Sequence, residues 1–126
     1  MQNNNKVLIV EDDTFLGGLL VEHFKKQGIN VELVTNAEDA LENILKDPPE
    51  LILLDILLPK MSGLEMMKKL QETNILPTLP IIILSNFSQK DKVEEGITLG
   101  ARDYLIKANV DLDEITKKVE AILAVV

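Results

Sequence analysis

The stretch Leu51-Ile-Leu-Leu-Asp55 decides the fold. Its apolar residues do not alternate with polar ones, which is typical of a strand buried on both faces, and a carboxylate follows at the C-terminal end. A second run of this kind, Ile81-Ile-Ile-Leu84, is followed by Ser85. Strands buried on both faces occur in parallel sheets that carry helices on each side. We therefore expect these two runs at the centre of such a sheet.

Further strand-like runs complete the pattern. The expected strands cover 6–10, 30–34, 51–54, 80–84 and 102–106. Between consecutive strands the chain is long enough for one helix, as in repeated strand–helix units. The sequence therefore predicts a single α/β domain over residues 1–126, without an internal repeat, a linker or a domain boundary.

Polar residues mark the starts of the expected helices, because their side chains can accept hydrogen bonds from the first free backbone N–H groups. The expected capping residues are Asn36, Ser62, Ser88 and Asp111. Ser62 and Asp111 are each followed three residues later by glutamate, which is the pattern of a capping box.

The helix expected over 89–98 differs from the others in composition. Its large apolar residues are Val93 and Ile97, among several charged residues and Gly96. Because little apolar surface is available for burial, we expect this helix to be the most loosely held.

Composition limits the classes of function. The chain has 126 residues, no cysteine and a formal net charge of −8. No run reaches the roughly 18 apolar residues of a membrane span, and no secretory signal is present, so we expect a cytoplasmic protein without a membrane partner. A strongly acidic surface repels the nucleic-acid backbone, which argues against direct binding of DNA or RNA.

Charged and polar side chains follow four of the expected strands. Glu11-Asp12-Asp13, Asp55, Ser85 and Lys107 each stand at a strand end. In an open parallel sheet these ends meet at one edge, where ligands bind. Mg²⁺ prefers oxygen ligands, so one or two of these carboxylates plus a phosphate oxygen make a credible metal site. The alternative for an acidic triplet is a helix cap, which Asp13 alone can supply.

Asp55 is the candidate nucleophile. A carboxylate can receive a phosphoryl group, and this reaction depends mainly on positioning and on the neutralisation of charge. Lys107 offers an ammonium and Ser85 a hydroxyl, which are natural partners of phosphate oxygens. Tyr104, three residues before Lys107, is either a packed edge aromatic or a reporter of site occupancy.

Together these residues resemble the receiver domain of two-component response regulators over essentially the whole chain. The acidic doublet Glu11-Asp12, the motif from Asp55 through Pro59 to Gly63, and the spacing to Ser85 and Lys107 all fit the pattern of that family. The resemblance implies a doubly wound five-stranded parallel sheet of order 2-1-3-4-5, with five helices in a three-layer α/β/α arrangement.

The resemblance also implies roles for individual residues. A histidine kinase or a histidine phosphotransfer protein would phosphorylate Asp55, with Mg²⁺ held by Asp12, Asp55 and the backbone carbonyl of Leu57, and with Glu11 acting mostly through water. Ser85 and Lys107 would bind phosphoryl oxygens. Tyr104 would turn inward as Ser85 moves. The surface formed by the fourth helix, fifth strand and fifth helix would then control an effector protein or domain, or pair two copies of the chain.

The sequence departs from the family pattern at several positions. Ala108 follows Lys107 where proline is common, which leaves the isomer of that peptide bond open. Lys60 stands where glycine is frequent. Leu57 and Phe87 lie two residues beyond Asp55 and Ser85, where apolar side chains would restrict the access of water to an acyl phosphate.

Three other interpretations compete. A phosphatase of the haloacid dehalogenase type needs aspartate where Glu11 stands, and it usually carries a substrate cap for which 126 residues leave no room. A receiver that is not phosphorylated would act only as an interaction module. The chain can also be the receiver portion of a longer response regulator or of a hybrid kinase.

Overall fold

A parallel five-stranded sheet forms the centre of the computed structural model, which describes residues 6–74, 79–109 and 111–123. The strands are β1 (Lys6–Val10), β2 (Asn30–Val34), β3 (Leu51–Asp55), β4 (Ile81–Ser85) and β5 (Asp103–Ile106). They lie in the order β2-β1-β3-β4-β5, and all neighbours are parallel. This confirms the predicted fold class, with strand ends shifted by at most one residue from the expected ranges.

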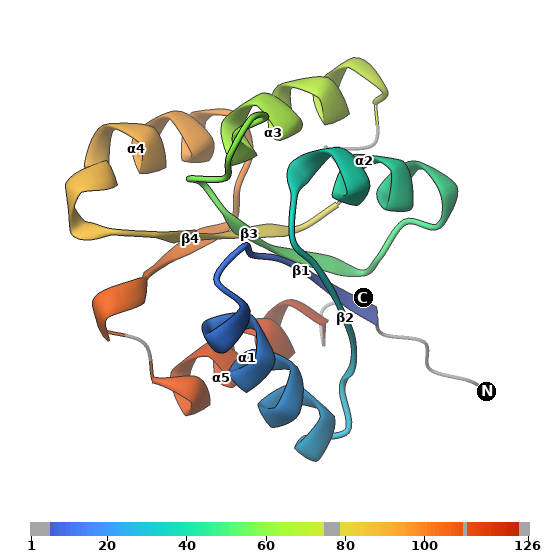
Figure 1. The fold of residues 1–126 in the computed structure, drawn as a ribbon, viewed down its shortest axis with the longest axis vertical. Coiled ribbons are helices and arrows are strands. Elements are labelled where there is room, and N and C mark those ends of the chain that lie inside the picture. Colours follow the sequence, from blue (N-terminus) through green and yellow to red (C-terminus); the bar gives the residue numbers. More distant parts are fainter. Residues whose placement is uncertain (1–5, 75–78, 110, 124–126) are drawn as a thin grey trace.

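Helices cover both faces of the sheet (Figure 1). They are α1 (Thr14–Lys26), α2 (Ala37–Lys46), α3 (Gly63–Glu72), α4 (Lys90–Thr98) and α5 (Leu112–Leu123). Helices α2, α3 and α4 lie on one face, while α1 and α5 lie on the other (Figure 1). Short 3-10 turns, Phe87–Gln89 and Lys107–Asn109, follow β4 and β5. The chain is therefore doubly wound, with three layers.

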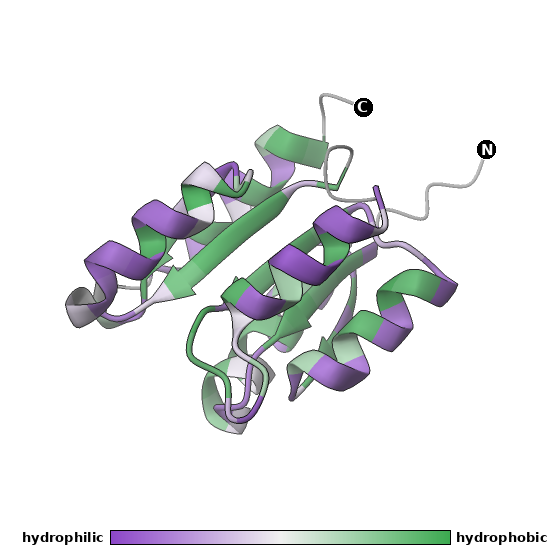
Figure 2. Ribbon diagram, turned by 90° about the horizontal axis from the view of Figure 1, so that it is seen from above, coloured by the Kyte–Doolittle hydropathy of each residue, from purple (hydrophilic) through white to green (hydrophobic). Residues whose placement is uncertain are grey.

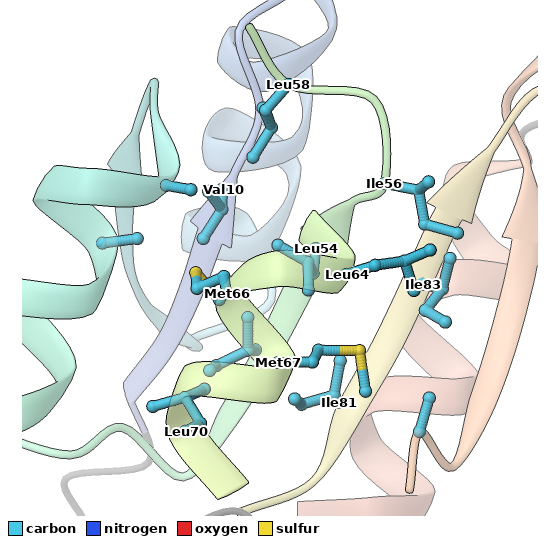
Figure 3. Packing of buried hydrophobic residues seen from close by; sticks show 14 of the residues in the cluster. Val10, Leu54, Ile56, Leu58, Leu64, Met66, Met67, Leu70, Ile81 and Ile83 are labelled. Atoms are coloured by element: carbon cyan, nitrogen blue, oxygen red, sulfur yellow. The ribbon is translucent and has the colours of Figure 1, made fainter. Parts of the chain in front are cut away.

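The central strands β1, β3 and β4 are mainly apolar, with polar residues at their ends, while polar residues gather on the outer sides of the helices (Figure 2). All five residues of β3 and of β4 are buried. On the face of α2, α3 and α4, the side chains of Leu54, Met66, Met67 and Ile81 pack together (Figure 3). The continuous apolar runs are therefore explained by burial on both faces.

Three of the expected helix caps are present. Asn36 accepts a hydrogen bond from the N–H of Asp39, and Ser62 forms a complete capping box with Glu65. Asp111 accepts a bond from the N–H of Asp113. The prediction for Ser88 was wrong. It lies inside the 3-10 turn after β4, so α4 begins at Lys90 without a side-chain cap.

Helix α4 buries little apolar surface, as expected, but it approaches the sheet closely. Its buried residues are Val93 and Gly96. A Cβ atom on Gly96 would come within 2.3 Å of Cδ1 of Ile83, so the helix lies against β4 and a methyl group there would require the end of the Ile83 side chain to move. The Lys68 ammonium lies 3.2 Å from the carboxylate of Glu95 and links α4 to α3.

Candidate functional site

Strand register brings four of the predicted site residues to one edge of the sheet. In the pairing of β1 with β3, the last residue of β1 faces the residue before Asp55. Glu11 and Asp55 therefore leave the sheet side by side. In the pairing of β4 with β5, Ser85 faces the last residue of β5, and Lys107 follows that residue. Because β3 and β4 are neighbours, these two pairs meet.

Lys107 joins the two buried carboxylates. Its Nζ atom donates to Oδ2 of Asp55 at 2.9 Å and to Oε2 of Glu11 at 3.0 Å. The same nitrogen lies 2.9 Å from Oε1 of Glu11, as an ion pair. One ammonium thus contacts two carboxylates that follow or end two different strands. Lys107 lies 96 residues after Glu11 in the chain.

Burial shapes the charges of this group. The side chain of Glu11 is fully buried, and that of Asp55 is 3% exposed. Desolvation raises the pKa of Glu11 to about 7, although hydrogen bonds from the Asp13 N–H and from Lys107 oppose the shift. Burial works to lower the pKa of Lys107, but its hydrogen bonds and ion pairs with Glu11 and Asp55 outweigh that effect and raise it. The ammonium is therefore held in its charged form.

Asp12 completes an acidic cluster. One carboxylate oxygen from each of Glu11, Asp12 and Asp55 lies within 4.8 Å of the others. Asp12 is exposed, so a cation could reach the cluster from that side. Asp13 has a different role, because its side chain accepts bonds from the N–H groups of Phe15 and Leu16 and caps α1. The predicted division between metal-binding acids and the capping acid is consistent with this geometry.

Two buried oxygen atoms at the site have no hydrogen-bond partner in the part of the chain that the structure describes. They are Oγ of Ser85 and Oε1 of Glu11, whose contact with Lys107 is an ion pair without hydrogen-bond geometry. An unsatisfied buried oxygen costs free energy, so such atoms call for a partner. A hydrated divalent cation suits the carboxylate oxygen, and a phosphoryl oxygen suits the hydroxyl. The residues present therefore fit Mg²⁺ and a phosphoryl group.

The loop after Asp55 is held by backbone contacts. The N–H of Leu57 donates to Oδ1 of Asp55 at 3.0 Å, while a metal bond from the Leu57 carbonyl stays a prediction. Lys60 has a φ of 64°, in the left-handed region that favours glycine. The next N–H, of Met61, donates to Glu38 on α2 at 3.3 Å. No sequence signal pointed to Glu38, because its partner is a backbone group distant along the chain.

The remaining predicted residues are not part of the acidic cluster. The Lys107–Ala108 peptide bond is trans, since the described residues contain no cis bond. The side chain of Leu57 is exposed beside the acceptor, and the side chain of Phe87 lies outside the described part of the chain. Tyr104 is 46% exposed and lines a groove of about 470 Å³ between α4 and β5, together with Val93 and Ile97. The proposed inward turn of Tyr104 therefore starts from an outward position.

This fold and this cluster of residues define a receiver domain. The family model of the response regulator receiver domain matches residues 7–120, so the chain belongs to that family. The predicted resemblance is confirmed. The transcriptional regulatory protein CpxR of Escherichia coli strain K12 is 39% identical over 119 residues, which cover 94% of this chain and 49% of that protein.

Two further proteins show the same likeness at nearly full length. The sporulation initiation phosphotransferase F of Bacillus subtilis is 33% identical over 120 residues, covering 95% of this chain and 94% of that protein. The receiver domain of the Francisella response regulator 1452 superposes with a TM-score of 0.86 at 30% identity, covering 96% of this chain and 98% of that one. The chain spans about half the length of several other curated relatives that it matches, which are transcriptional regulatory proteins. Within the described ranges, no helix is long and apolar enough to cross a membrane.

The raised pKa of Glu11 predicts a stability that falls with rising pH. The folded pKa of about 7 exceeds the ordinary value of 4.5, so the folded state binds the proton more tightly than the unfolded state. The resulting stabilisation is fully present below pH 4.5 and is lost as pH rises through 7. Without divalent cations, the free energy of unfolding should fall by on the order of 3 kcal/mol across this window from this group.

The check is denaturant unfolding of the wild type, Glu11→Gln and Glu22→Gln in the presence of a chelator. Glu11→Gln should flatten the pH dependence. Glu22→Gln makes the same change of charge at an exposed position on α1 and should leave the slope as in the wild type. An unchanged slope in Glu11→Gln would show that Glu11 has the same pKa in the folded and in the unfolded protein.

Proposed function

We propose that this receiver accepts a phosphoryl group on Asp55 from a histidine kinase or a histidine phosphotransfer protein, in a reaction that depends on Mg²⁺. The observation that carries the proposal is the contact of the Lys107 ammonium with the Asp55 carboxylate, which forms an acidic cluster with Glu11 and Asp12. The nearby Ser85 hydroxyl has no hydrogen-bond partner among the described residues. Membership of the receiver family supports the same role.

The transfer needs little from the protein beyond placement and charge. A carboxylate oxygen of Asp55 forms a bond to phosphorus while the bond from phosphorus to the donor's histidine nitrogen breaks. The electron pair of that bond stays on the imidazole, which then takes a proton from solvent. Lys107 and Ser85 would hold two of the phosphoryl oxygens, which carry the negative charge.

Asp12 and Asp55 would hold the cation with the Leu57 carbonyl, and Glu11 would act through water. When bound, Mg²⁺ neutralises charge on the carboxylates and on the incoming phosphoryl oxygens. In the unphosphorylated protein, the Lys107 ammonium lies between Glu11 and Asp55. On phosphorylation it would shift from these two carboxylates towards the phosphoryl group. That shift is how occupancy of the site would reach β5, whose last residue precedes Lys107.

The output surface would be formed by α4, β5 and α5. The groove between α4 and β5 is lined mainly by apolar atoms of Val93, Ile97 and Tyr104, and both Ile97 and Tyr104 are exposed. A downstream effector, or a second copy of the chain, would bind this surface after phosphorylation. Because α4 buries few apolar side chains, a shift of this helix between two positions costs little free energy.

Two alternatives remain within the family. Several relatives are about twice the length of this chain, so the receiver can act within a longer regulator or a hybrid kinase. The phosphotransferase from Bacillus subtilis, in contrast, is matched over 94% of its length. A receiver that is not phosphorylated would not need the Lys107 contact or the acidic cluster, and we therefore place it second.

Asp55→Asn should abolish phosphorylation, because the amide is not an anionic nucleophile. Wild-type protein incubated with acetyl phosphate and Mg²⁺ should gain the mass of one phosphoryl group in electrospray mass spectrometry. Asp13→Asn is the matched control, since it changes a neighbouring aspartate that caps α1, and asparagine caps equally well. Undiminished labelling of Asp55→Asn would mean that another residue is the acceptor.

Phosphorylation should change amide exchange most strongly between residues 86 and 108. This range includes α4 and β5, where few apolar contacts resist a shift. The measurement is hydrogen exchange with and without a beryllofluoride adduct in the presence of Mg²⁺, with Asp55→Asn as the variant that should show no response. Changes confined to α1 and α2 would contradict the proposed output surface.

A further inference from the structure

Gly63, the first residue of α3, contacts the backbone that carries the phosphoacceptor. A Cβ atom on Gly63 would lie 2.5 Å from the carbonyl oxygen of Asp55, 3.0 Å from Cα of Ile56 and 3.2 Å from Cγ of Leu54. The N–H of Gly63 donates to the carbonyl oxygen of Ile56 at 3.0 Å. The start of the helix therefore lies against the end of β3 with no space for a side chain.

The reason for glycine here is space and not backbone conformation. Gly63 lies within the regular helix α3, and its φ is not in the left-handed region. By comparison, a Cβ atom on Gly18, on the exposed side of α1, would have no atom of the described residues within 4 Å. The glycine that ends the Asp55-to-Gly63 motif is thus explained by the close approach of α3 to β3.

Both sides of the contact are fixed. The capping box of Ser62 and Glu65 sets the first turn of α3, whose inner side chains pack in the core (Figure 3). On the other side, β3 pairs with both β1 and β4, and the N–H of Ile56 donates to the carbonyl of Leu84 at 3.1 Å. An added methyl group would therefore displace the peptide between Asp55 and Ile56.

That peptide determines where the carboxylate of Asp55 points. Oδ1 accepts a bond from the Leu57 N–H at 3.0 Å, and Oδ2 accepts one from Lys107 at 2.9 Å. Restoring ordinary van der Waals contact at Gly63 needs a shift of about 1 Å, and a misplacement of that size can slow a reaction by up to about a hundredfold.

We propose that Gly63 is a positioning residue for phosphoryl transfer. By lacking a side chain it lets the start of α3 support the Asp55–Ile56 peptide and so orient the acceptor carboxylate. This proposal rests on the proposed function of Asp55. It assigns to the first turn of α3 a role in the rate of phosphorylation, separate from its role in the core.

The test compares glycine-to-alanine variants at Gly63, Gly96 and Gly18. Labelling by acetyl phosphate with Mg²⁺ is measured per folded molecule, and the amide resonance of Leu57 is followed by NMR. We expect Gly63→Ala to lower the labelling rate at least about tenfold and to shift the Leu57 resonance. Gly96→Ala introduces a clash with the Ile83 side chain on β4, so it controls for lost stability. Gly18→Ala adds a methyl group in open space.

If Gly63→Ala does not fold, the removal of caps gives a second comparison. Ser62→Ala removes the side-chain bond that fixes the start of α3, and Asn36→Ala removes the equivalent bond from α2. Labelling should slow in Ser62→Ala and stay at the wild-type rate in Asn36→Ala.

Several outcomes would overturn the proposal. Wild-type labelling of Gly63→Ala would show that the helix moves and the acceptor does not. Wild-type labelling of Ser62→Ala would show that the start of α3 does not orient the acceptor. If labelling slows equally in Gly63→Ala and Gly96→Ala, lost stability alone explains the slower labelling, and Gly63 has no positioning role. A wild-type protein that takes no phosphoryl group would overturn the proposed function as well, so the two failures are distinguishable.

Discussion

The ion pairs of Lys107 with Glu11 and Asp55 are the constraint on which the rest of the site depends. Two carboxylates buried at adjacent strand ends repel each other, and their desolvation is costly unless a cation lies between them. Here one ammonium supplies that charge at 2.9 Å from each carboxylate. Because Lys107 follows β5, the charge balance at the centre of the sheet is tied directly to the edge strand.

The parallel sheet makes this arrangement possible. Each strand delivers its polar residue at the same edge, so groups far apart in the chain meet without any long loop. Burial of β3 and β4 on both faces fixes where those residues emerge. In the same way, the backbone contact at Gly63 ties α3 to the acceptor. The contacts that pack β3, β4 and α3 together therefore also set the positions of the site residues.

Much of this could be predicted from the sequence. Unbroken apolar runs identified β3 and β4, and polar residues at strand ends identified the cluster. Other features could not be predicted. Ser88 resembled a cap, but a 3-10 turn after β4 delays the start of α4, and such turns leave little pattern. The contact of Glu38 with the Met61 N–H involves a backbone group, which carries no sequence signature. Gly63 belonged to the motif, but the motif did not show that this glycine contacts the Asp55 carbonyl.

The most direct test of the account is the thermal stability of Asp12→Asn with and without Mg²⁺. If the acidic cluster is a cation site, removing one charge should relieve repulsion and raise the melting temperature of the cation-free protein by about 4 °C per kcal/mol gained. The stabilisation by Mg²⁺ should weaken in parallel, because a ligand of the cation is lost. A variant less stable than the wild type, with its Mg²⁺ response intact, would contradict the account.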